Sequence, residues 1–106
     1  MSERLLKSAE ITAALRKHGV PEHLHRGLIT YLLDGVRPGG FLMAFLSGDL
    51  WRAIDAADDD SIAAFRQLRR FLANEGPAQC YGTLDNVRQW MAKGGLLGRQ
   101  LAEEDA

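Results

Sequence analysis

Apolar residues recur along this chain at the spacing of helices. Between residues 21 and 35 they stand four, three and one positions apart and so share one face of a helix. These residues are Leu24, Leu28, Tyr31 and Leu32. Comparable faces run from residue 62 to 72 and from residue 84 to 91, whereas strand patterns are scarce. The pattern predicts an all-α fold, a compact single domain of five or six short helices without a sheet.

Glycine, proline and capping residues mark where these helices are expected to begin and end. Gly19 and Gly35 suit the left-handed position just past a helix, and Pro21 suits a first helical turn. The acidic run Asp58-Asp59-Asp60 stands at the start of what should be the longest helix, where the helix dipole favours negative charge. Together the signals predict helices at about residues 3–18, 21–35, 41–46, 50–57, 61–74 and 83–94.

A rigid connector, Arg37-Pro38-Gly39-Gly40, opens into a segment from Phe41 to Leu46 that is apolar at every position. A helix that is apolar on all sides is typical of burial, so we expect this segment to be the most buried part of the fold. The Gly39-Gly40 pair also leaves backbone N–H groups free at a helix start, where an anion can bind beside Arg37. A tight turn that requires glycine is the simpler interpretation.

The size of the chain fits one domain. A chain of 106 residues can bury roughly two thirds of the surface that it exposes when unfolded. Within it we expect an N-terminal helical extension over residues 1–20, a helical core domain over residues 21–95 and a frayed C-terminal tail over residues 96–106. No apolar run approaches the ~20 residues that span a bilayer. The first residues of the sequence are charged and lack the apolar segment of a signal peptide. An intracellular protein is the expectation.

Charge and cysteine content narrow the possible functions. Thirteen basic and fourteen acidic residues give a formal net charge of −1, without the basic excess that is usual for nucleic-acid or membrane-surface binders. Cys80 is the single cysteine, so no internal disulfide and no cysteine-rich zinc site can form.

Several motifs along the chain form a distinctive combination. They are Tyr31, the run Pro38-x-Gly40-Phe41-Leu42-x-Ala44-x-Leu46-Ser47-x-Asp49-Leu50, then Ala56-Ala57-Asp58, then Asn74-Glu75-x-Pro77-Ala78-x-Cys80-x-Gly82, and Trp90. Over about residues 21–94 this combination resembles a family of short phage- and prophage-encoded proteins without an established activity. The resemblance implies a setting, the cytoplasm of a bacterial host, and no mechanism. Gly48 stands where the family has Asn, and both residues tolerate positive φ.

No combination of residues predicts catalysis. His23 and His25 are two positions apart, on different sides of a helix, and His18 lies across a proline turn, so we expect solvated histidines rather than a metal site. Cys80 lacks a protease signature or a Cys-x-x-Cys partner and is expected to pack as a small hydrophobic residue. The acidic run at Asp58 lacks the alternating ligands of a calcium loop. We predict no catalytic residue, no metal and no cofactor.

The clearest recognition chemistry lies on the helix expected at residues 61–74. Arg66, Arg69 and Arg70 stand three and four positions apart and share one face. Guanidinium groups recognise carboxylates and phosphates, although a solvated face is the simpler interpretation. Tyr81 and Trp90 flank a loop with glycines at 76 and 82, where aromatic side chains either bind a partner or seal the core.

These observations favour a small non-enzymatic accessory protein that binds a host or phage macromolecule, with a protein as the first expectation. Inhibition of a host process or defence is implied by the resemblance alone. A module that sequesters a phosphate-bearing small molecule such as a nucleotide is the alternative, and a DNA-binding regulator, disfavoured by net charge, is a third. The expected binding residues are Arg37, Gly39, Gly40, Arg66, Arg69, Arg70, Asn74, Glu75, Gln79 and Tyr81.

Overall fold

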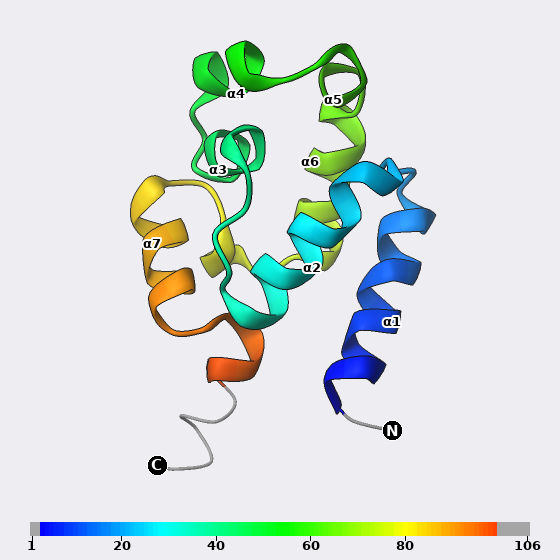
Figure 1. Cartoon of the computed structure of the whole chain (residues 1–106), viewed down its shortest axis with the longest axis vertical. Coiled ribbons are helices and arrows are strands. Elements are labelled where there is room, and N and C mark those ends of the chain that lie inside the picture. Colours follow the sequence, from blue (N-terminus) through cyan, green and yellow to red (C-terminus); the bar gives the residue numbers. More distant parts are fainter. Residues whose placement is uncertain (1–2, 100–106) are drawn as a thin grey trace.

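A computed structural model describes residues 3–99, and it contains helices, turns and loops but no strand in that range (Figure 1). In chain order the elements are α1 (Glu3–Lys17), the 3₁₀-helix η1 (Glu22–Leu24), α2 (His25–Asp34), α3 (Gly40–Leu46), α4 (Leu50–Ala56), α5 (Asp59–Ala63), α6 (Phe65–Glu75), the 3₁₀-helix η2 (Ala78–Cys80) and α7 (Leu84–Ala92). A further helical turn spans residues 95–99. The predicted all-α class is confirmed.

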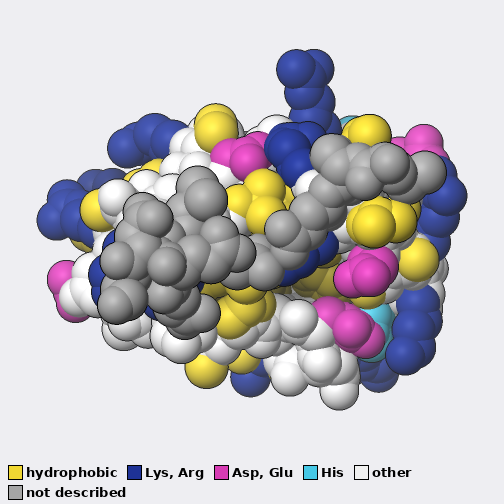
Figure 2. Space-filling model, turned by 90° about the horizontal axis from the view of Figure 1, so that it is seen from below, with side chains coloured by type: hydrophobic (Ala, Val, Ile, Leu, Met, Phe, Trp, Pro, Cys, Tyr) yellow, Lys and Arg dark blue, Asp and Glu magenta, His cyan; other side chains and the backbone are white. Residues whose placement is uncertain are grey.

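The helices form a short bundle with α1 and α7 on its two sides. In Figure 1, α1 lies along one side next to α2, and α7 lies on the other side below α3. Helices α4 and α5 occupy the end opposite the start of α1. Figure 2 shows the opposite end of the molecule. Lys and Arg side chains project around its rim, and hydrophobic side chains are exposed between them. No helix in residues 3–99 is long and apolar enough to cross a membrane.

The core centres on α2, α6 and α7. Tyr31 and Trp90 are fully buried and connected, since the Tyr31 hydroxyl donates to the Cys80 carbonyl at 2.6 Å and Trp90 Nε1 donates to the Tyr31 carbonyl at 2.9 Å. Phe71 of α6 packs in the same cluster. Helix α1 contributes Leu15, which is also fully buried. Each polar atom in these two contacts has a partner, so the aromatic core is buried without unsatisfied donors.

The division of the chain at residue 20 stays a prediction, and the structure places α1 against α2 and α6. Of the expected tail, residues 100–106 lie outside the described residues. Residues 96–99 belong to the last helical turn, and Leu96 packs partly buried against the core.

Burial of the central segment is lower than predicted. In α3, Leu42 and Leu46 are buried, whereas Phe41 and Phe45 are only half-buried. The two phenylalanines instead meet Phe65 in an aromatic cluster, with ring centroids 5.7 Å and 5.2 Å from it. The prediction was wrong because α3 is a short helix near one end of the molecule, where neighbours cover it incompletely.

The expected helix at 61–74 is two helices. Asp58 caps α5 as predicted, with its Oδ1 accepting from the Ser61 N–H at 2.7 Å. The helix then breaks at buried Ala64, whose φ and ψ of −92° and 0° leave the helical range. Its N–H donates to the Ser61 carbonyl, three residues back, at 3.1 Å. As a result α1, with 15 residues, and not this segment, is the longest helix in the described range.

Two pairs of glycines allow helix ends to approach each other closely. Gly35 ends α2 with φ of 69°, and a Cβ there would stand 2.8 Å from the Gly95 nitrogen. Gly48 follows α3 with φ of 77°, and a Cβ there would stand 2.6 Å from the Gly82 carbonyl oxygen. Only glycine fits such positions without strain. These contacts join α2 to the turn after α7 and α3 to the loop before α7.

The connector before α3 does not need its glycines. Gly39 has an ordinary φ of −64° with ψ of 171°, and a Cβ at Gly39 or Gly40 would meet nothing within 4 Å. The interpretation of this segment as a turn that requires glycine was therefore wrong.

Candidate functional site

Helix α6 presents its arginines on an exposed face. Arg66, Arg69 and Arg70 are all exposed, while the opposite face of the helix buries Leu68 and Phe71. Among residues 3–99, no carboxylate lies within 4.0 Å of any of the three guanidinium groups. The amphipathic pattern of α6 thus gives three cations that are free to bind an external anion.

Tyr81 extends this face beyond the helix. The guanidinium carbon of Arg69 stands 5.9 Å from the centroid of the Tyr81 ring, at the outer limit of a cation–π contact. Asn86 Nδ2 donates to the Tyr81 carbonyl at 3.0 Å and so holds the loop in place. We call the surface made by Arg66, Arg69, Arg70 and Tyr81 the arginine face.

The other residues predicted at the end of α6 have mainly local roles. Asn74 Nδ2 donates to the Arg70 carbonyl at 2.8 Å within the last turn. Glu75 Oε1 lies 3.4 Å from His18 Nε2 and 3.7 Å from Lys17 Nζ, which joins α6 to α1. Gln79 is exposed in η2. Glu75 also lines an apolar cavity of about 310 Å³ on that side of the molecule.

Arg37, Gly39 and Gly40 lie in the connector between α2 and α3. Arg37 and Gly40 line an open groove of about 1050 Å³ between α3, α4 and α7. None of the α6 arginines lines this groove. The structure therefore does not bring the glycine connector and the arginine face into one pocket.

This groove contains an aromatic residue that the sequence analysis did not select. Trp51 of α4 is 77% exposed, and its neighbour Leu50 is 54% exposed. The signal was present in the sequence: α4 places the small Ala53 inward, so its larger apolar residues are left outside. Other apolar residues that line the groove are Met43, Ala44, Leu84 and Met91.

Charges of both signs surround the groove. Arg52 of α4 pairs with Asp49, the residue just before the helix, with 3.5 Å between Nε and Oδ2. Arg37, Arg88 and Asp55 also line the groove, and within the described part of the chain none of these three has an oppositely charged group within 4.0 Å.

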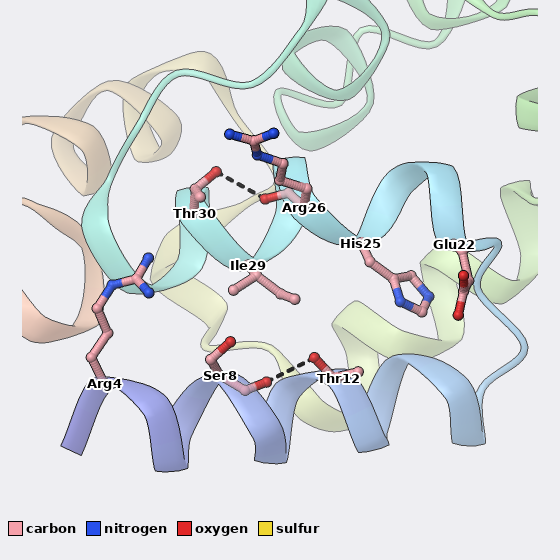
Figure 3. A pocket seen from close by; sticks show the side chains of 8 residues that line it. All are labelled: Arg4, Ser8, Thr12, Glu22, His25, Arg26, Ile29 and Thr30. Carbon is pink, nitrogen blue, oxygen red and sulfur yellow. Dashed lines mark hydrogen bonds between the residues drawn. The ribbon is translucent and has the colours of Figure 1, made fainter. Parts of the chain in front are cut away.

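A polar groove of about 420 Å³ separates α1 from α2 (Figure 3). Arg4 reaches across from α1 and binds the Asp34 carboxylate through two contacts, at 3.3 Å and 2.6 Å. Arg26 points away from α1, whereas Ile29 points toward it. Because Arg4 is paired and Arg26 is turned outward, this groove offers little to an anionic ligand.

The titratable groups of residues 3–99 include one contact between a hydroxyl and a possible base: His23 Nε2 lies 3.2 Å from Oγ of Ser61, which is buried at the start of α5. Burial raises the pKa of the Cys80 thiol to about 12, so the thiol keeps its proton at neutral pH and is a poor nucleophile. No group of three or more potential metal ligands occurs in this range. His25 is buried, with Nε2 at 2.7 Å from the Val20 carbonyl, so the expectation of a solvated histidine was wrong there.

Comparisons of the chain with protein-family models, with curated proteins and with solved structures gave no match. A function for this chain therefore rests on the chemistry of its own surfaces.

Proposed function

We propose that this chain is a non-enzymatic module that binds a protein partner through the arginine face. The observation that carries the proposal is the set of three exposed arginines on α6 without a carboxylate partner in the described part of the chain. Planar guanidinium groups pair with carboxylates through two parallel hydrogen bonds. The partner surface is accordingly expected to be acidic.

Two further features support a protein partner. Arginine and tyrosine are enriched at protein interfaces and at their energetic hot spots, and Tyr81 lies beside Arg69. The chain as a whole has a net charge of −1, so the positive potential is local to this face. A local patch favours recognition of one acidic surface over general binding to nucleic acid.

The accessory role rests on the resemblance of residues 21–94 to short phage and prophage proteins. A small protein of that kind, produced in a bacterial cytoplasm, would act by occupying a surface of another protein. Inhibition of a host process is the form of action that we propose.

The nucleotide alternative has less support. Small-molecule sites are usually concave and enclose most of the ligand, and none of the three cavities described above is lined by an arginine of α6. Arg37 and Gly40 of the glycine connector line the groove of α3, α4 and α7, so they share no cavity with the arginine face in which one phosphate would be held.

The proposal is tested by capture from bacterial lysate with mass spectrometry. Replacement of Arg66, Arg69 and Arg70 together by Gln should abolish capture of the partner, because three charge-assisted hydrogen-bond donors are lost. The triple variant should remain folded, since surface changes of this kind usually alter stability by less than about 0.5 kcal/mol each.

The matched control also removes three exposed cations, by the changes Arg16→Gln, Arg26→Gln and Lys93→Gln on α1, on α2 and after α7. It should capture the partner normally. A folded Arg66/Arg69/Arg70 variant that captures the same partner at full strength would refute the proposed face.

A further inference from the structure

Helix α4 exposes a group of large apolar side chains. Leu50, Trp51 and Ile54 are exposed, and Ala53 is the only buried residue of the helix. Single exposed apolar residues are ordinary, but a contiguous group of large ones marks an interaction site. Tryptophan is also among the residues most enriched at hot spots.

The same surface has both a projection and a hollow. Trp51 projects from α4 with 77% of its surface exposed, and it borders the groove of about 1050 Å³ that Met43, Leu84 and Met91 line. A surface with this combination is able to pair with a copy of itself, because the projection of each copy fills the hollow of the other.

The charged residues that line the groove also favour a second copy of this chain as the partner. The groove is lined by three arginines, at 37, 52 and 88, and by two aspartates, at 49 and 55. Arg52 and Asp49 pair with each other, which leaves Arg37, Arg88 and Asp55 as the charges of the groove that face a partner. In a two-fold interface, residue i of one copy meets residue j of the other and the reverse. A rim of mixed sign is therefore complementary to itself.

We propose that the groove between α3, α4 and α7 binds a second copy of this chain, in a two-fold dimer with each Trp51 in the groove of the other copy. Arg37 and Arg88 of one copy face Asp55 of the other. The dimer does not rest on the proposed function, because the groove and the arginine face share no residue. It would display two arginine faces.

Sedimentation velocity of the full chain over a range of concentrations tests the dimer. The wild type should shift from monomer to dimer as concentration rises, and Trp51→Ala should weaken self-association at least tenfold. Ile62→Ala removes an exposed apolar side chain of α5 outside the groove and should leave self-association unchanged. The tryptophan emission, to which buried Trp90 also contributes, should move to shorter wavelength on dimerisation, because the Trp51 ring leaves water.

A charge exchange tests the interface without removing apolar surface. The variant Arg37→Glu/Arg88→Glu and the variant Asp55→Arg should each self-associate more weakly than the wild type, and a mixture of the two should regain association. A wild type that stays monomeric at all concentrations overturns the proposal, as does a dimer that Trp51→Ala leaves intact. Protection of Trp51 only when a different protein is bound overturns it in favour of that protein.

Discussion

Cys80 and Tyr31 show how burial in the core decides what a side chain can do. The Cys80 carbonyl accepts from the Tyr31 hydroxyl, and both side chains are fully buried. Burial raises the pKa of each group above its ordinary value. Neither group therefore ionises near neutral pH, and both serve packing rather than nucleophilic chemistry.

This burial predicts a loss of stability in alkaline solution. Between the ordinary thiol pKa of 9.0 and the folded pKa of about 12, the unfolded chain releases the Cys80 proton and the folded chain retains it. The unfolded state then binds fewer protons, so the free energy of unfolding falls as pH rises through this range.

Urea titrations at several pH values should detect the fall, and Cys80→Ala should make it shallower. A free energy of unfolding that declines equally in both proteins between pH 9 and pH 11 would show that the thiol is not the cause, and would leave Tyr31 as the titrating group.

At the level of elements, close glycine contacts allow helix ends to approach each other. Gly35→Ala should lower the free energy of unfolding by more than about 1 kcal/mol, because left-handed backbone strains a side chain and the new Cβ would approach Gly95. Gly40→Ala should be neutral or stabilise by up to about 1 kcal/mol, since alanine favours the helix and the space is open.

Thermal and urea unfolding of the two variants compare them directly. Equal destabilisation by both changes would mean that the connector before α3 is constrained in a way that its dihedral angles do not explain.

The sequence predicted element types well and burial less well. Gly35, Asp58 and Thr83 end or cap helices at the positions that their local chemistry predicts. Thr83, for example, accepts a hydrogen bond from the Asn86 N–H at 3.1 Å. The helix break at Ala64 falls at a residue buried in the core, and the partial burial of Phe45 depends on its contact with Phe65 of another helix. Composition within one helix does not carry that information.

For the whole molecule, the local distribution of charge matters more for binding than the net charge does. The balance of −1 combines an arginine face on α6 with an acidic stretch at Asp58-Asp59-Asp60 at the start of α5. The spacing of the arginines predicted their shared face, because helical periodicity is local. The approach of Tyr81 to Arg69 and the Trp51 groove arise from tertiary packing, so the sequence alone did not identify them as surfaces.

Covalent footprinting with phenylglyoxal, which reacts with guanidinium groups, locates the surface that binds the partner. The protein is labelled alone and in the complex captured from lysate, and each arginine is quantified by mass spectrometry. Arg66, Arg69 and Arg70 should lose most of their reactivity in the complex, while Arg16 and Arg26 keep theirs. Equal labelling of the three α6 arginines with and without the partner would contradict the account.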